Sequence, residues 1–212
     1  MKSVLISIRP KWCELIASGK KTIEVRKTRP KIEAPFKVYI YCTHARNPIR
    51  DSGRILMYED DLALTNRWGQ GKLVENPCGT MMEGEFFLNG KVIGEFVCDR
   101  IDIIDVIDDG TMTYIRVNQK ADMFIRQKTC LGINGLQHYL DDRSGYGWHI
   151  SDLKIYDVPK ELGDFWKADK CPYATENDCT YKYHCFRAGQ TQRCGEELTR
   201  PPQSWCYVEE LQ

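Results

Sequence analysis

The chain has 212 residues, and its 30 basic residues balance 30 acidic ones, which leaves no net charge. This balance excludes a surface that binds nucleic-acid phosphates along its whole length, because such surfaces carry a basic surplus. The composition, 42% hydrophobic and 28% charged, is that of a globular protein with a sizeable core. No segment approaches the roughly 20 apolar residues that span a bilayer, so no membrane partner is expected.

The ten cysteines bear on the cellular compartment. The sequence opens on a strand-like run without a long apolar signal core, so we expect reduced thiols or metal ligands rather than a disulfide framework. A cytoplasmic protein is the simplest prediction.

A short helix is predicted near the start of the chain. Pro10 suits a first helical position, and Gly19 is well placed to end the helix. One apolar face is formed by Trp12, Leu15 and Ile16.

A strand with three charged residues follows this helix. Its alternation points Ile23 and Val25 to one face and Glu24 and Arg26 to the other, with Lys21 at the edge. A charged strand face is usually solvated surface, or here a Glu–Arg pair that stabilises a hairpin. Beside a glycine turn, these groups could instead hold a planar polar ligand such as a nucleobase or phosphate. The first 31 residues are also markedly basic.

The remaining predicted elements are mostly strands. In chain order they are a strand at 37–42, an irregular stretch at 43–80 with a short helix near 58–64, a hairpin at 85–97 that turns at Asn89-Gly90, a strand at 101–107, helices near 121–129 and 133–140, and a final strand at 148–158 closed by Pro159. This order predicts the α+β class and a small β-barrel with flanking helices.

The stretch Gly19-x-Lys21-x-x-Glu24-x-Arg26 resembles the G-x-K-x-x-E-x-R signature of the ASCH domain family, a relative of the PUA RNA-binding domain. Further similarity follows in chain order at residues 5–10, 94–97 and 145–150. The resemblance implies an ASCH domain over residues 1–160 with a PUA-like β-barrel. It also implies RNA or a modified nucleoside as ligand, in a cleft lined by the charged trio. The candidate ligand-binding residues are Arg9, Gly19, Arg26 and His149.

The same resemblance implies an enzymatic alternative. Some bacterial ASCH proteins are amidohydrolases that release acetate from N4-acetylcytidine with a lysine, a threonine and a later glutamate, and at least one member is a ribonuclease. Lys21 matches the lysine, Glu24 stands at the threonine position, and Glu95 is a candidate for the later glutamate. Lys21 as base or nucleophile and Glu24 as general acid–base are the candidate catalytic residues.

Aromatic and histidine side chains near the end of the predicted barrel could take part in base binding. Alternation separates Trp148, which we interpret as core, from His149, which is the better-placed polar group. His44 could close one end of the cleft.

Residues 168–212 form a cysteine-rich extension that is poor in aliphatic residues. Its spacing, Cys171-x7-Cys179-x5-Cys185-x8-Cys194, partly resembles a CCCH zinc finger, with Gly189 where the closing histidine would stand. His184 and Cys206 are rival ligands. Free thiols, a disulfide, or an adaptor surface that binds a protein partner are the alternatives.

We predict that Cys171, Cys179, Cys185 and Cys194 bind one zinc ion, because a segment with so few apolar residues cannot build a core of its own. Elemental analysis of protein purified without chelator should find one zinc per chain. Chelation should loosen the extension and leave the barrel folded. Absence of stoichiometric metal, with all these thiols freely reactive, would contradict the site.

Overall fold

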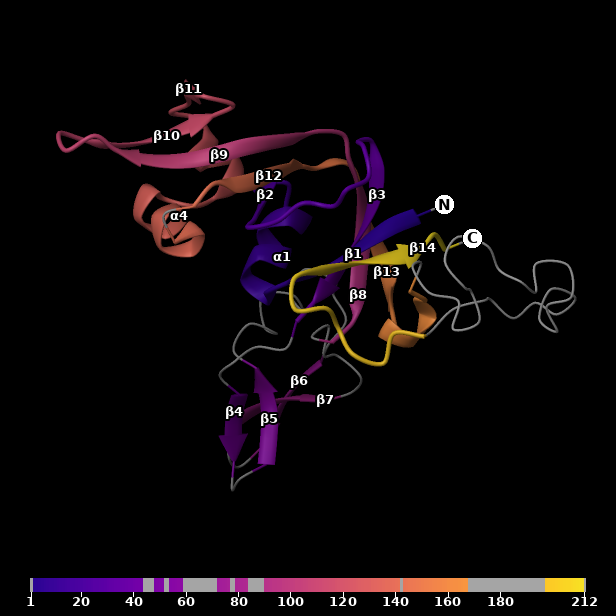
Figure 1. Ribbon diagram of the computed structural model, residues 1–212. Helices are drawn as coiled ribbons and strands as arrows, with labels where there is room; N and C mark the ends of the chain where they lie inside the picture. Colours follow the sequence, from indigo (N-terminus) through magenta and orange to yellow (C-terminus); the bar gives the residue numbers. More distant parts are fainter. Residues whose placement is uncertain are drawn as a thin grey trace, which may run out of the picture.

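The computed structural model describes residues 2–43, 48–51, 54–58, 72–76, 79–83, 90–141, 143–167 and 197–211 (Figure 1). The strands of this part of the chain gather mainly into two five-stranded sheets. His44, Asn89 and the four predicted zinc ligands lie outside the described residues, as does nearly all of the short helix predicted near 58–64.

Sheet A carries the main core. Its strand order is β13 (Ser151–Lys160), β8 (Val92–Cys98), β3 (Phe36–Cys42), β1 (Lys2–Ile8) and β14 (Trp205–Glu209). β1 and β3 are parallel, and all other neighbours are antiparallel. Because β1 and β3 are central, both their faces are covered. Val4 and Ile6 belong to the core cluster on one face, whereas Leu5 belongs to the cluster on the other.

Sheet B is fully antiparallel and carries the charged strand at its edge. Its order is β11 (Lys120–Ala121), β10 (Thr113–Val117), β9 (Ile101–Asp108), β12 (Gly145–His149) and β2 (Ile23–Arg26). Figure 1 shows the β9–β10 hairpin extending away from sheet A.

The chain passes directly from one sheet to the other at two places. Only residues 99–100 separate β8 from β9, and only Ile150 separates β12 from β13. The prediction of one strand over 148–158 was therefore wrong, because the chain bends at Ile150 and changes sheet. Pro159 lies within β13 rather than after it.

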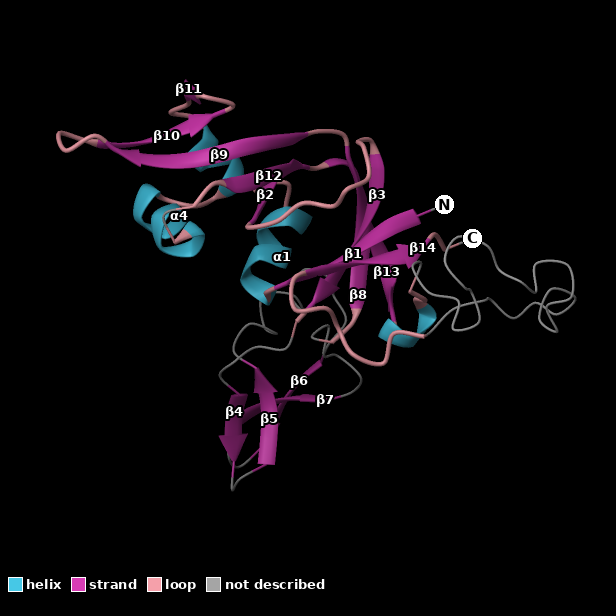
Figure 2. Cartoon of the chain, viewed as in Figure 1, coloured by secondary structure: helices cyan, strands magenta, loops and turns pink. Residues whose placement is uncertain are grey.

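The described helices are few and short (Figure 2). They are α1 (Pro10–Ala17), α3 (Ile125–Thr129), α4 (Ile133–Leu140) and the 3-10 helix η1 (Leu162–Asp164). α1 packs Cys13 and Ile16 into the main core, while α3 and α4 cover the face of sheet B that carries Ile23 and Val25. None of the helices in the described ranges is long and apolar enough to cross a membrane.

The α+β class is confirmed, with strands in the majority. The hydrogen bonds among the described strands do not close them into a barrel, since β13 and β14 end one sheet and β11 and β2 end the other. The stretch predicted to be irregular also contains two hairpins: β4 (Pro48–Asp51) with β5 (Arg54–Tyr58), and β6 (Lys72–Asn76) with β7 (Gly79–Glu83).

Candidate ligand-binding site

A tight turn after α1 delivers Lys21 to the start of β2. Gly19 has a φ of +73°, a left-handed conformation that other residues adopt only with strain. The Gly19 amide donates to the Ile16 carbonyl and the Lys21 amide to the Leu15 carbonyl, both at 2.9 Å. The predicted roles of Pro10 and Gly19 at the two ends of the helix are both confirmed.

The three charged side chains converge into one buried network. Glu24 accepts from Lys21 Nζ at 3.3 Å through one carboxylate oxygen and from Arg26 Nη2 at 3.0 Å through the other. Lys21, Glu24 and Arg26 are only 2%, 6% and 7% exposed. The interpretation of this strand face as solvated surface is therefore wrong. The network holds one surplus positive charge inside the protein.

Two backbone carbonyls outside β2 accept hydrogen bonds from the two cations. Lys21 Nζ donates to the Thr129 carbonyl at the end of α3 over 2.7 Å, and Arg26 Nη2 donates to the Ser7 carbonyl of β1 over 2.6 Å. Thr129 is itself fully buried, and its hydroxyl donates to the Ile125 carbonyl. The network thus connects β2 with α3 on one side and with sheet A on the other.

Two buried donors next to the network have no hydrogen-bond partner among the residues that the structure describes. They are Arg26 Nε and Trp148 Nε1. Trp148 lies directly opposite Glu24 in the β2–β12 pair, so the two side chains share a face. Its ring packs against Phe36 and Trp205, which confirms its interpretation as core. Buried donors are normally satisfied, so an acceptor oxygen has two unused N–H groups available here.

Tyr139 of α4 and exposed Arg9 border the network. Burial raises the pKa of the Tyr139 hydroxyl; the charges of Arg26 and Arg9 lower that pKa, and Glu24 raises it further. The sequence did not single out Tyr139 or Thr129 for this site. Each is an ordinary member of a short helix, and only the packing of α3 against β2 and of α4 against β9 and β10 brings them to it.

His149 lies apart from the network. It opposes Ile23 and not Glu24, so it is on the other face of sheet B. Its Nε2 is 2.6 Å from the buried Asp102 carboxylate and 3.0 Å from Arg100 Nη2. Asn118 Nδ2 also donates to Asp102, over 2.9 Å.

Asp102 makes the stability pH-dependent. Burial alone raises the pKa of its carboxyl, but hydrogen bonds from Asn118 and His149 and the Arg100 charge together lower it below its ordinary value. A lowered folded-state pKa contributes stability above about pH 4, which is lost as the pH falls through the lower, folded value. Asp102→Asn should therefore flatten the acid dependence of the unfolding free energy in urea titrations. The exposed Asp141→Asn is the control, and equal acid slopes in the two variants would contradict the prediction.

Glu95 also lies away from Lys21. It opposes Tyr39 in the β3–β8 pair, and Tyr39 belongs to the core on the face of sheet A opposite α1. The Glu95 carboxylate accepts from the Tyr156 hydroxyl at 2.6 Å and lies 3.8 Å from Lys37 Nζ. Glu95 thus has structural partners of its own.

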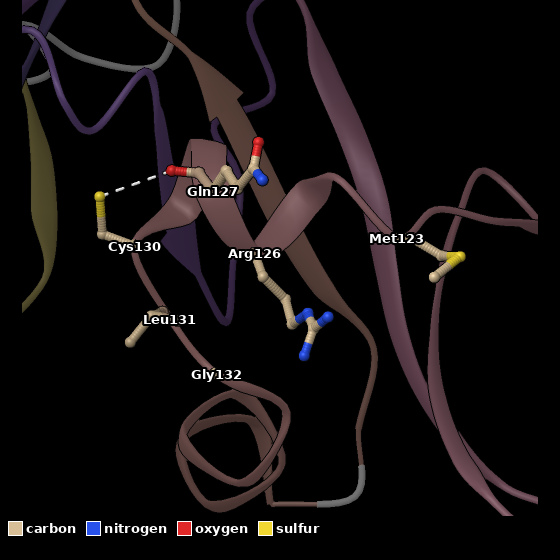
Figure 3. Close-up of a pocket in the computed structure, with 6 residues that line it drawn as sticks. All are labelled: Met123, Arg126, Gln127, Cys130, Leu131 and Gly132. Atoms are coloured by element: carbon tan, nitrogen blue, oxygen red, sulfur yellow. Dashed lines mark hydrogen bonds between the residues drawn. The ribbon is translucent and has the colours of Figure 1, made fainter.

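An open hollow lies beside α3 (Figure 3). It is lined by Met123, Arg126, Gln127, Cys130, Leu131 and Gly132. The thiol of Cys130 donates to the Gln127 carbonyl at 3.6 Å and to the Lys20 carbonyl at 3.5 Å. Lys21, Glu24 and Arg26 do not line this hollow, so the cleft expected around them stays a prediction.

The described part of the chain holds no group of three metal-ligating side chains. Cys206, the rival ligand, lies in β14 opposite Leu5. The zinc site and a protein partner for the extension remain predictions from the sequence, because the four principal cysteines lie outside the described residues.

Comparison with known proteins identifies the family. The ASCH domain model matches residues 6–123, which is more than half of the chain. The chain belongs to the ASCH domain family. The match includes the turn, the charged strand and β3, so the buried network lies within the ASCH domain.

Among solved structures, this ASCH chain is similar to an ASCH protein from Zymomonas mobilis at 16% identity and a TM-score of 0.47, over 98% of this chain and 88% of that one. A single-substitution variant of that protein matches at 15% identity and a TM-score of 0.46, over 98% and 89%. A second variant matches at 17% identity and a TM-score of 0.41, over 76% and 77%. The search of curated proteins found no match.

Proposed function

We propose that this ASCH-domain protein binds RNA or a modified nucleoside at the Lys21–Glu24–Arg26 network. The observation that supports this most is that two buried donors, Arg26 Nε and Trp148 Nε1, have no partner within the described part of the chain and lie beside a cluster with one surplus positive charge. A carbonyl or phosphate oxygen of a nucleotide has the chemistry to accept from them.

The burial of the network also favours a functional role. A buried ion pair rarely gains stability over well-packed apolar residues, because both charges lose their hydration. Lys21, Glu24 and Arg26 are nonetheless almost fully enclosed. Binding of a ligand through oriented donors and an oriented carboxylate accounts for buried charges that folding alone does not favour.

Binding of a nucleoside panel and a short RNA, measured by calorimetry, tests this function. Glu24→Gln keeps the shape of the side chain and removes its charge, so it should weaken binding at least tenfold, the effect of about 1.4 kcal/mol. Glu161→Gln is the matched control, because Glu161 is exposed and pairs with Lys91 away from the network. Absence of binding to every nucleoside and RNA, or equal binding by the two variants, would refute the proposal.

Hydrolysis of an N4-acylated cytidine is the second candidate. It is supported by the buried amine of Lys21, which lies 3.3 Å from a carboxylate that could move protons. Incubation with N4-acetylcytidine, followed by chromatography, should then yield cytidine and acetate. Loss of turnover in Lys21→Arg, with ligand binding retained, would assign the chemistry to the amine, whereas binding without turnover in the wild type would leave a binding module.

A further inference from the structure

A small apolar patch surrounds the open hollow beside α3. Met123 and Phe124, which precede the helix, are 77% and 67% exposed, although both are large apolar residues. Leu131, which follows the helix, is half-buried and lines the hollow together with Met123. Isolated exposed apolar residues are common on any protein, whereas adjacent ones beside a concave surface are typical of an interaction site.

The register of α3 explains why these side chains face outward. Ile125 and Thr129 lie about one helical turn apart and are 1% and 0% exposed, so they anchor the inner side of the helix. Phe124 and Lys128 have the same spacing one position earlier, and both are exposed. The Asp122 carboxylate accepts from the amides of Phe124 and Ile125 at 2.7 and 3.0 Å. The backbone under Phe124 is therefore tied to the start of the helix.

The charge around the hollow is positive. Residues 118–140 contain one acidic residue, Asp122, and three lysines or arginines: Lys120, Arg126 and Lys128. All three cations are exposed, whereas the Asp122 carboxylate is engaged by backbone amides. Among the six residues that line the hollow, Arg126 is the one with a charged side chain (Figure 3). The whole chain has no net charge, so this concentration of basic residues is local.

We propose that the α3 surface, which consists of Met123, Phe124, Arg126, Lys128 and Leu131, docks an acidic peptide segment of a partner protein. An apolar side chain of the segment enters the hollow against Met123 and Leu131, and neighbouring carboxylates lie beside Arg126 and Lys128. Buried anchor side chains supply most of the affinity of such interfaces, and complementary charge gives specificity and fast association.

The hollow favours a peptide over two other anionic partners, nucleic acid and a membrane. None of its six lining residues is aromatic, so a base finds no ring to stack on inside it. A membrane takes up apolar side chains that protrude, so it would leave the hollow unfilled. The volume of about 320 Å³ is at the lower end of the range for ligand sites, roughly 300–1,000 Å³, which suits a side chain better than a large ligand.

Selection from a phage-displayed library of short random peptides, with the full chain immobilised, tests the proposal. The enriched sequences should place leucine, methionine or phenylalanine among aspartates and glutamates. A synthetic peptide of the enriched sequence, labelled with a fluorophore, then gives the affinity by anisotropy. Failure to enrich any sequence, or enrichment of sequences without acidic residues, overturns the proposal.

Variants of the full chain place the selected peptide on the α3 surface. Met123→Ala, Phe124→Ala and Arg126→Glu should each weaken its binding at least about fivefold, as expected for residues at the centre of an interface. The matched controls are Met112→Ala, 61% exposed at the β9–β10 hairpin, and the exposed Arg200→Glu, and both should bind like the wild type. All five residues are exposed, so thermal unfolding should be unchanged. Wild-type binding by the three α3 variants overturns the proposal.

Salt and two further ligands separate the classes of partner. Peptide affinity should fall as salt rises, and less steeply in Arg126→Glu. Binding of a single-stranded RNA, or of vesicles of phosphatidylcholine and phosphatidylserine, that is weakened by Met123→Ala would assign the surface to nucleic acid or to a membrane and overturn the proposal. Nucleoside binding at the Lys21–Glu24–Arg26 network should be the same in every α3 variant, so the peptide site and the proposed function are tested separately.

Discussion

Replacing Glu24 with alanine is expected to lower the free energy of unfolding by about 3–5 kcal/mol, because it leaves two buried cations without their shared carboxylate. Lys21 would keep its hydrogen bond to the Thr129 carbonyl, and Arg26 would keep those to the Ser7 carbonyl and the Ser204 hydroxyl. Denaturant unfolding measures the loss. Glu161→Ala, an exposed glutamate in a surface pair, should change stability by less than about 1 kcal/mol and serves as the control.

A triple variant separates stability from function. Replacing Lys21, Glu24 and Arg26 together by apolar residues of similar size removes all three buried charges, so much of the stability lost in Glu24→Ala should return. Ligand binding should not return with it. A Glu24→Ala protein as stable as the wild type would show that these charges are not held inside the fold.

The second large effect is expected at Trp148. Trp148→Ala should cost about 3–5 kcal/mol, the usual loss when a fully buried aromatic side chain is removed from a core. The Trp148 ring contacts Phe36 of β3 and Trp205 of β14, so its loss opens a cavity between sheet B and sheet A. Trp148→Phe keeps part of the packing and should cost clearly less. The shift in denaturant midpoint measures both variants.

The Trp148 variants also bear on the site. Because Trp148 lies opposite Glu24 across the β2–β12 pair, the cavity adjoins the charged network. A Trp148→Ala protein that unfolds like the wild type would contradict the close packing of the two sheets at this point.

Local sequence patterns correctly predicted the helix, the turn and the strand that carry the site. Pro10 and Gly19 mark the ends of α1 through their own backbone preferences, and the alternation along β2 places Glu24 and Arg26 on one face. These features depend on residues close together in sequence, so the sequence contains the information that they require.

The burial of the network was not predictable in this way. Charged residues on a strand are usually exposed, and the groups that hold Lys21 and Arg26 are backbone carbonyls, of which that of Thr129 is 108 residues away in sequence. The bend at Ile150 was not predictable either. The apolar alternation of the sequence continues through Ile150, and only the change of pairing partner, from β2 before the bend to β8 after it, reveals the bend. The existence of β14 also depends on its partner strand, because its five residues lie in a polar region of the sequence and pair with β1.

The pairing of β1 with β14 has a consequence for how the protein is made. Leu5 lies opposite Cys206, so β1 acquires this neighbour only when about 200 further residues have been synthesised. Until then one side of β1 presents unpaired backbone groups, a template on which nascent chains can associate. Chains cut before residue 205 should share that exposed edge. They should therefore aggregate during expression even though the whole ASCH motif is present in them.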